Sequence, residues 1–553
     1  MSEPSPVAGS GRGRRLIPYA LLALLSLALY LPGIAAIPAF DRDEARFAEA
    51  SRQMLESGDF VRIRFQNQAR DKKPVGIYWL QAASVALFSA PRSRAIWPYR
   101  LPSVFGATAA VMLTLALGRR LFPENPHAGP AAAVLLASSL ALVAEAHLAK
   151  TDAMLLAAVA AAQASLGLVY TEARAGRRPG WGPALVFWIA QAVGMLLKGP
   201  VAPVISLLTL ASLAVADRDI RWVAGLRPMA GLILAAALVM PWLFAVERAT
   251  QGRFLVGALG RDLLPKLLGA EESHGAPPGS YLLLLPAAFW PGSLYLVPAL
   301  HRGWRRRRAP AERFLLAWLV PAWALFELVP TKLPHYVLPL YPALALFAGR
   351  ALAELPTLAM PRGAAFADRA VAVLWSLATL ALALLLVALP MRLGHGMSMA
   401  AIGGAALTLV LAGALLVARR RYALAAPLAF AFVATLAAVL PGLDRLWLSR
   451  SAAALVARDP PPAGEPLVSV GYSEPSLVFL LGPGTALLTP GNAAAALAHG
   501  GRALVGESDR AAFQAALAAG GLLGRAEGAV SGLDYSTGRR LVLTLYAVRP
   551  GSR

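Results

Sequence analysis

The chain has 553 residues, of which 58% are hydrophobic and only 15% are charged; its formal net charge is +22, and it contains no cysteine. This apolar share exceeds what a soluble core of that length would bury, so the composition indicates a polytopic membrane protein. Nucleic-acid binding is disfavoured because most arginines form short clusters between apolar stretches, and the lack of cysteine excludes disulfides, thiolate metal sites and cysteine nucleophiles.

Membrane-crossing helices need about 20 apolar residues each, and the sequence predicts about thirteen of them. The first follows a basic N-terminal stretch and is interpreted as a retained helix rather than a removed signal peptide. The apolar windows are 16–34, 101–118, 129–147, 152–171, 182–199, 200–216, 227–246, 280–300, 314–330, 335–353, 369–390, 398–418 and 422–441. The shorter apolar stretch 78–90 has basic residues on both sides, so we expect a helix in the membrane interface there.

The arginine clusters predict the orientation in the membrane. With the N-terminus in the cytoplasm, every cluster beside a short loop falls on the cytoplasmic side, as the positive-inside rule requires. The clusters are Arg119–Arg120, Arg174 with Arg177 and Arg178, Arg218 with Arg221 and Arg227, Arg302 with Arg305–Arg308, Arg362 with Arg369, and Arg419–Arg421. The C-terminal part of the chain is therefore expected on the outer side of the membrane.

A long outer loop, 35–100, is polar and carries both signs of charge. Its segment from Asp43 to Glu56 has helix-forming composition and stops at Gly58, which places Asp43, Arg46 and Phe47 on one face. Asp43 could act as a general base or could cap this helix. Asp41 is the better cap candidate, because Glu44 follows it at the capping-box spacing. The loop also holds six arginines that could bind an anion: Arg42, Arg46, Arg52, Arg62, Arg64 and Arg70.

Further cations stand at the outer ends of predicted helices. They are Lys72 and Lys73 before Tyr78 and Trp79, Lys150 close to Asp152, Lys198, and Lys332 before His335. Each lysine could be a headgroup anchor or a snorkelling side chain. All of these lysines are predicted on the same outer face of the membrane as Asp43. Ionisable residues at membrane depth are energetically costly unless they meet a partner or a substrate, so this common placement favours a phosphate-binding cavity. His274, in the outer segment 247–279, is a possible metal ligand without a second ligand at close spacing.

Beyond Leu443 the composition changes, which predicts two domains, 1–442 in the membrane and 443–553 outside it. The run from Asp459 to Pro466 is expected to be a stiff linker. After it, the strand-like runs LVSVGY, TALLTP, RALVGES and RLVLTLYAV alternate with alanine-rich helical ones, which indicates a small soluble α/β domain. Its glycines lack the spacing of a nucleotide-binding fingerprint.

Several motifs together resemble the aminoarabinose transferases that modify lipid A, within the protein O-mannosyltransferase superfamily of GT-C glycosyltransferases. The resemblance covers most of the membrane part. It is carried by Asp43-Glu44-x-Arg46-Phe47-Ala48-Glu49, Met54-Leu55-x-Ser57-Gly58-Asp59, Lys73-Pro74, Tyr78-Trp79, Lys150-Thr151-Asp152, Leu197-Lys198-Gly199-Pro200, His274 ahead of Tyr281, and Lys332-Leu333-Pro334-His335-Tyr336-Val337-Leu338-Pro339.

The resemblance implies a GT-C membrane fold and transfer of a sugar from polyprenyl (undecaprenyl) phosphate to a lipid A-like lipid or glycan on the periplasmic side. Asp43 would be the catalytic carboxylate and Asp152 a supporting one. The substrate-binding residues would be Arg46, Lys72, Lys73, Tyr78, Lys198, Lys332 and His335. The family loop commonly reads Glu-Lys-Pro and this chain has Lys72-Lys73-Pro74, so we expect no required metal or other cofactor, although a divalent metal at His274 is conceivable.

Two other function classes stay open at this point. A secondary transporter or a lipid or glycan flippase would concentrate ionisable residues near the bilayer midplane, often in repeated halves. Here the candidates gather on one face and the sequence shows no internal repeat. A polymerase or ligase of lipid-linked glycans would share the same substrate side.

Overall fold

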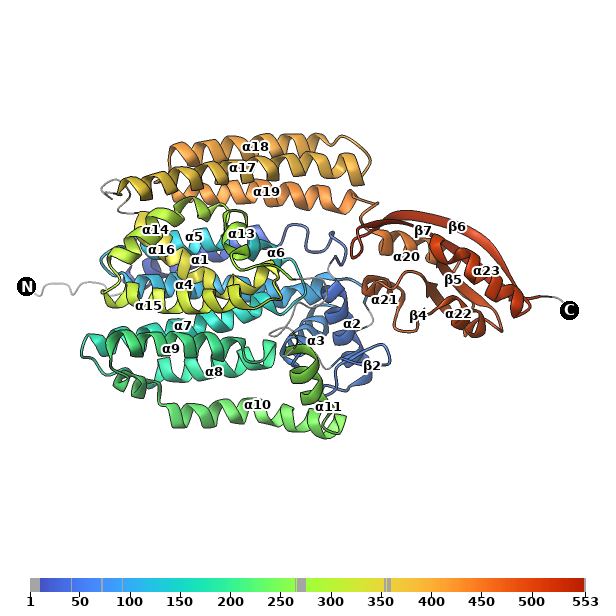
Figure 1. Ribbon diagram of the computed structural model, residues 1–553, viewed down its shortest axis with the longest axis horizontal. Coiled ribbons are helices and arrows are strands. Elements are labelled where there is room, and N and C mark those ends of the chain that lie inside the picture. Colours follow the sequence, from blue (N-terminus) through green and yellow to red (C-terminus); the bar gives the residue numbers. More distant parts are fainter. Residues whose placement is uncertain are drawn as a thin grey trace, which may run out of the picture.

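The structure is a computed structural model that describes residues 10–40, 42–70, 73–91, 93–263, 275–352 and 360–551, together with Pro265 and Leu355. A bundle of roughly parallel helices forms one end of the elongated molecule, and a sheet domain forms the other (Figure 1). The short helices of the loop after α1 lie between the two. The loop therefore sits where the membrane bundle meets the sheet domain.

The helices of the bundle follow the predicted apolar windows in order. They are α1 (Ser10–Tyr30), α4 (Trp97–Leu121), α5 (Ala128–Ala137), α6 (Leu140–Ala146), α7 (Asp152–Arg174), α8 (Trp181–Lys198), α9 (Val201–Asp217), α10 (Pro228–Thr250), α13 (Ser280–Ala288), α14 (Leu296–Arg305), α15 (Pro310–Leu328), α16 (Tyr341–Leu352), α17 (Arg362–Leu393), α18 (Met399–Val417) and α19 (Ala425–Val439). A short helix α11 (Arg253–Leu255) follows α10.

Fewer of these helices than predicted are long and apolar enough to span a membrane. Among the described residues seven qualify, or up to nine if each of two bent pairs is one span. The pair α5 and α6 is bent by 59°, and the pair formed by α13 with Gly292–Arg305 by 111°. The predicted count of thirteen is not confirmed, because elements such as α9, with 17 residues, and α16, with 12, are shorter than a full span.

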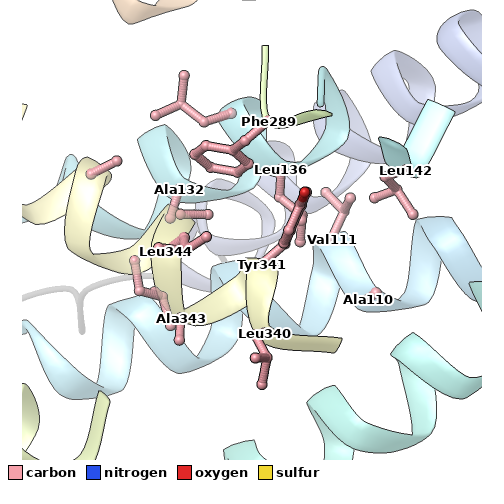
Figure 2. Packing of buried hydrophobic residues seen from close by; sticks show 14 of the residues in the cluster. Ala110, Val111, Ala132, Leu136, Leu142, Phe289, Leu340, Tyr341, Ala343 and Leu344 are labelled. Carbon is pink, nitrogen blue, oxygen red and sulfur yellow. The ribbon is translucent and has the colours of Figure 1, made fainter. Parts of the chain in front are cut away.

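The core of the bundle is built around α16. Every residue of this helix is buried, as expected of a helix that is apolar on all sides. Its Tyr341 and Leu344 pack among Phe289, Leu136 and Val111, so that α16 joins α5 and α4 (Figure 2).

Close approach of α4 and α7 depends on Gly106. A Cβ atom at this position would lie 2.7 Å from the carbonyl oxygen of Ala153 and 2.8 Å from the Cα atom of Met154, both in the first turn of α7. Only glycine lets the two backbones come this near, as is common between membrane helices. Gly106 therefore sets the position of the first turn of α7, which starts at Asp152.

We expect Gly106→Ala to lower stability by about 1–3 kcal/mol, because the added methyl group must displace backbone rather than a flexible side chain. Gly403→Ala in α18 is the matched control, since no atom lies within 4 Å of its added Cβ. Thermal unfolding of the detergent-solubilised protein measures both. Equal melting temperatures for the two variants would contradict the role of Gly106.

The outer loop folds into two helices and a hairpin. Helix α2 (Arg42–Ser57) is followed by β1 (Arg64–Phe65) and β2 (Gln68–Ala69), which pair antiparallel, and then by α3 (Gly76–Phe88). The helix predicted over Asp43–Glu56 is confirmed, and its stop at Gly58 agrees with a left-handed φ of 68° there. Asp41, the expected cap, lies outside the described residues.

The C-terminal part forms a five-stranded sheet in the order β4-β3-β5-β7-β6. Its strands are β3 (Leu467–Val470), β4 (Ala486–Leu487), β5 (Gly501–Gly506), β6 (Leu522–Asp534) and β7 (Arg539–Pro550), and its helices are α20 (Leu448–Arg458), α21 (Pro475–Leu481), α22 (Pro490–Ala496) and α23 (Arg510–Ala519). The first three strands pair in parallel, whereas β7 runs antiparallel to both β5 and β6. The predicted α/β character is confirmed, and the boundary at residue 443 stays a prediction.

One strand of this domain was not predicted. The edge strand β6 escaped prediction because its sequence LLGRAEGAVSGLD is rich in glycine and alanine and only two of its 13 residues are buried. The run Asp459–Pro466, expected to be a stiff linker, connects α20 to β3, and Asp459 pairs with Arg502 at 2.7 Å.

The C-terminal domain docks on α2 through α21. The ring of Phe479 is fully buried in a cluster with Ala45, Ala48 and Tyr99 from the loop and α4, and its carbonyl oxygen accepts a hydrogen bond of 3.1 Å from Arg52. Arg42 at the start of α2 pairs with Glu474 at 3.6 Å. The soluble domain thus completes the core beneath the helix that carries Asp43.

Candidate active site

A buried ion pair anchors the candidate active site. Glu44 in the first turn of α2 is 0% exposed and Arg100 of α4 is 1% exposed, and they form two hydrogen bonds of 2.7 and 3.0 Å. The remaining donors of Arg100 reach the carbonyl oxygens of Ile34, Ile37 and Pro38 at 2.7 to 3.0 Å. All five guanidinium N–H groups therefore have partners.

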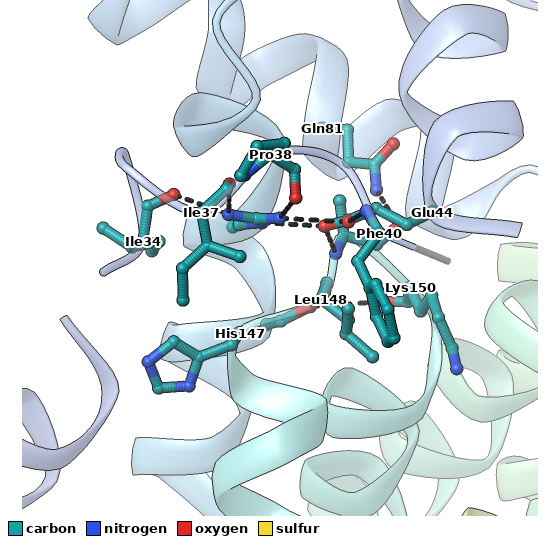
Figure 3. Close-up of polar contacts among 12 residues, drawn as sticks. Ile34, Ile37, Pro38, Phe40, Glu44, Gln81, His147, Leu148 and Lys150 are labelled. Atoms are coloured by element: carbon teal, nitrogen blue, oxygen red, sulfur yellow. Dashed lines mark hydrogen bonds and ion pairs between the residues drawn. The ribbon is translucent and has the colours of Figure 1, made fainter. Parts of the chain in front are cut away.

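The same carboxylate joins two segments that are distant in the sequence. Glu44 also accepts hydrogen bonds from the backbone amides of Phe40 and Ala149, both at 2.9 Å. Figure 3 shows Glu44 next to Phe40, close to the turn around Leu148 and Lys150. Glu44 thus ties the start of α2 to the turn that leads into α7, so the neighbours Asp43 and Asp152 are positioned by a common partner.

We expect Glu44→Gln to destabilise the protein by about 3–5 kcal/mol, because it leaves the buried guanidinium of Arg100 without a counter-charge. The readout is the melting temperature of purified protein, with Glu507→Gln on the exposed surface of the C-terminal domain as the control. If Glu44→Gln has the same melting temperature as the wild type, the hydrogen bonds of Glu44 rather than its charge hold this site.

Asp43 lies in a cationic environment at the first turn of α2. Its carboxylate oxygen Oδ1 is 3.4 Å from Arg70 Nη2 and 3.7 Å from Arg46 Nη1, and its side chain is 51% exposed. Partial burial raises the pKa of Asp43, but Arg70, Arg46, Lys150 and Lys73 together outweigh this effect and hold the pKa below its usual value. Asp43 is therefore ionised at neutral pH.

Arg70 is more buried than Arg46, the other arginine beside Asp43. It is 10% exposed, donates to the phenol oxygen of Tyr78 at 3.0 Å, and stacks over the ring of Phe47 at 5.0 Å. Tyr78 itself is fully buried and lies 5.3 Å from Phe47, centroid to centroid. In the sequence Arg70 was only one of six loop arginines, and no spacing signal set it apart.

We expect Arg70→Gln to raise the pKa of Asp43, because it removes the largest of the cationic effects on that carboxylate. The acid limb of the activity profile should then move to higher pH. Measuring kcat/KM against pH tests this, with Arg221→Gln, an exposed arginine elsewhere on the molecule, as the control. An unmoved acid limb would show that Asp43 does not control the rate.

A second cluster of charges surrounds Asp152 at the start of α7. Lys198, the last residue of α8, forms a short ion pair with Asp152, and its ammonium lies 4.9 Å from the centre of the Tyr336 ring. His335 stands between two carboxylates, with Nδ1 3.3 Å from Glu145 and Nε2 3.8 Å from Asp152. All of these side chains are largely buried.

Lys150 links the two clusters. It pairs with Glu145 at 3.3 Å and interacts electrostatically with both Asp43 and Asp152. The structure therefore brings together Asp43, Arg46, Lys73, Lys150, Asp152, Lys198 and His335, as expected from the sequence, and adds Arg70, Glu145 and Tyr336. Among the groups named here, five cations face three carboxylates.

One other predicted residue, Lys332, has different surroundings, and two more are not described. Lys332 donates hydrogen bonds to the carbonyl oxygens of Ala276 and Val329 at 2.8 and 2.7 Å, which favours a role in holding the turn before η4 (Pro334–Leu340). Lys72 and His274 lie outside the described residues. Within the part that the structure describes, no group of three or more His, Asp or Glu side chains could hold a metal ion, so the expectation about a metal at His274 stays a prediction.

Comparison with known proteins gives consistent matches. Residues 72–244 match the family described as dolichyl-phosphate-mannose-protein mannosyltransferase. A curated relative from Pseudomonas paraeruginosa, named undecaprenyl phosphate-alpha-4-amino-4-deoxy-L-arabinose arabinosyl transferase, is 30% identical over 56% of this chain and 55% of its own length. Its namesake from Erwinia tasmaniensis is 29% identical over 59% and 58%. The chain thus matches little more than half the length of these curated relatives.

Solved structures match over nearly the whole chain. The crystal structure of ArnT from Cupriavidus metallidurans in the apo state has a TM-score of 0.75 at 19% identity and covers 97% of this chain and 98% of that one. The crystal structure of the same protein bound to undecaprenyl phosphate has a TM-score of 0.73 at 18% identity, with the same coverage. The resemblance predicted from the sequence is confirmed: this chain is similar to the aminoarabinose transferases and has the GT-C membrane fold of ArnT.

Proposed function

We propose that this protein is an inner-membrane glycosyltransferase that moves a sugar from a polyprenyl phosphate to a lipid A-like lipid or a glycan on the periplasmic side. The observation that carries the proposal is the excess of cations around the ionised Asp43, at the end of the helical bundle that faces the sheet domain. The names of the similar curated proteins, and the undecaprenyl phosphate in the second ArnT crystal structure, support a polyprenyl phosphate donor.

The cations suit a phosphate leaving group. An acceptor oxygen attacks the anomeric carbon, the bond from that carbon to the phosphate oxygen breaks, and its electron pair stays on the lipid phosphate. Arg46, Lys73 and Lys198 stabilise the negative charge that develops there, in a partly desolvated site where such stabilisation is strong. A single direct displacement inverts the anomeric centre.

Asp43 acts on the acceptor. It takes the proton when the acceptor is a hydroxyl group, or orients the acceptor when this is itself a phosphate. Its lowered pKa keeps the carboxylate ionised, and Arg70, supported by Tyr78 and Phe47, holds it in place. In this proposal Tyr78 acts through Arg70 rather than by touching the substrate.

Asp152 supports the donor side. Its ion pair fixes the ammonium of Lys198, and His335 with Glu145 completes a buried network in which two lysines balance two carboxylates. Lys198 can still donate hydrogen bonds to the phosphate, while the excess positive charge comes from Arg46, Arg70 and Lys73 near Asp43. We assign Lys72 to the same phosphate and Lys332 to the turn before η4, and we propose no required metal.

The topology is part of the proposal. Thirteen membrane crossings, some of them short or bent, would place the N-terminus in the cytoplasm and the C-terminal domain in the periplasm. The start of α1 and the sheet domain lie at opposite ends of the bundle in Figure 1, which supports an odd number of crossings. The arginine clusters on the predicted cytoplasmic side support the orientation.

We expect Asp43→Asn to abolish sugar transfer while the protein still accumulates in the membrane, because the change removes the charge and keeps the shape. Mass spectrometry of membrane lipids and envelope glycans, from cells that lack the protein or carry either form, measures the product. A sugar-sized mass that is absent in both the deletion and the variant supports the assignment.

Two other outcomes would contradict it. Full transfer by Asp43→Asn would remove that residue from the mechanism. An unchanged glycolipid profile, together with a precursor that accumulates on the inner leaflet of the deletion strain, would instead favour a transporter or flippase.

A further inference from the structure

A groove lies at the far end of α2 from Asp43, where the outer loop meets the C-terminal domain. Its volume is about 330 Å³, within the range of small-molecule sites. Its walls come from the end of α2, the β1–β2 hairpin and a loop of the sheet domain, and include Gln53, Ser57, Arg62, Gln66, Asn67 and Pro483. Most of the lining belongs to the outer loop, and Pro483 is the lining residue that the C-terminal domain contributes.

The walls of the groove are held in place by specific hydrogen bonds. The side-chain amide of Gln66 donates to the carbonyl oxygens of Pro483 and Thr485 at 3.2 and 2.6 Å. Gln66 has a left-handed φ of 56°, which a glutamine rarely adopts without such support. Asp59 accepts from the amides of Val61 and Arg62 at 3.1 and 3.0 Å, which fixes the turn between α2 and the hairpin.

The chemistry of the groove differs from that of the site around Asp43. Its charges cancel, because Glu56 and Asp59 stand against Arg62 and Arg64, and Asp59 lies 2.6 and 4.0 Å from those arginines. The other polar lining groups are amides and a hydroxyl, which can both donate and accept hydrogen bonds. Such a surface suits the hydroxyl groups of a carbohydrate, whereas a free phosphate would favour the cationic site.

The active site and the groove lie at the two ends of α2, and Glu49 and Ala50 in the turn between them are buried. Arg46, Gln53 and Ser57 are separated by seven and four residues, so they lie on one face of the helix, and all three are at least partly exposed. Gln53 follows Asp43 by ten residues, about 15 Å along the helix axis. An acceptor of a few sugar residues could span this length with its reacting group at Asp43.

We propose that the groove binds the carbohydrate part of the acceptor and makes the C-terminal domain part of acceptor recognition. This inference rests on the proposed glycosyltransferase function and names a binding site for the acceptor sugar, separate from the cationic site for the donor phosphate. The recognising groups are Gln53 and Asn67, with Gln66 holding the hairpin against the sheet domain.

The test uses the full-length protein in detergent and the water-soluble phosphorylated diglucosamine that remains when lipid A is deacylated. Isothermal titration calorimetry measures its Kd for the wild type, for the double variant Gln53→Ala/Asn67→Ala, and for Gln68→Ala. Gln68 is the matched control, because it is an exposed glutamine of the same hairpin that does not line the groove. We expect the double variant to bind about tenfold more weakly, and the control to bind like the wild type.

A kinetic assay separates this proposal from the proposed function. With a polyprenyl phosphate sugar as donor and intact lipid A as acceptor, the double variant should raise the KM for the acceptor and leave the KM for the donor unchanged. Equal Kd and acceptor KM in the double variant and the wild type would overturn the groove assignment while transfer itself stands. A third outcome separates the two proposals in the other direction. If the double variant binds the headgroup more weakly but the wild type transfers no sugar, the groove assignment stands and the glycosyltransferase function is wrong.

Discussion

The ion pair between Glu44 and Arg100 is the constraint on which the rest of the site depends. A buried pair of this kind is costly to desolvate, and it is tolerated because nearly every donor and acceptor finds a partner. Here the guanidinium uses all five N–H groups, and the carboxylate receives two further backbone amides. The pair thereby connects the end of α1, the start of α2, α4 and the turn before α7.

Charge is distributed unevenly among the site around Asp43, the network around Asp152 and the groove. The network of Asp152, Lys198, Glu145, Lys150 and His335 is balanced and largely buried, so it can persist without a ligand. The surroundings of Asp43 are more exposed and carry an excess of cations, which would be matched by an incoming anion. The groove at the other end of α2 is neutral. In the proposed function, the donor phosphate would therefore bind at the cationic end of α2 and the acceptor sugar at its neutral end.

Features that depend on a short stretch of sequence could be predicted. The amphipathic pattern from Asp43 to Glu56 predicted α2, and the rarity of charge in apolar helices pointed to Asp152 and Lys198, which the structure brings together. Partners far apart in the chain left no such signal. Glu44 was interpreted as part of a helix cap, although its main partner is Arg100, and Arg70 was not distinguished from its neighbours. The ammonium of Lys332 meets backbone carbonyls, which no side-chain pattern could predict.

The burial of Phe479 has a consequence for how the protein is made. The core under α2 includes this ring from the C-terminal domain, and the bond from Arg52 to its carbonyl oxygen spans 427 residues of sequence. Domains generally fold from the N-terminus during synthesis, but this loop cannot complete its core until α21 has been synthesised and has packed against α2. Assembly of the site around Asp43 is thus delayed until nearly the whole chain is in place. A partly synthesised protein would hold the lipid-facing helices without a finished active site.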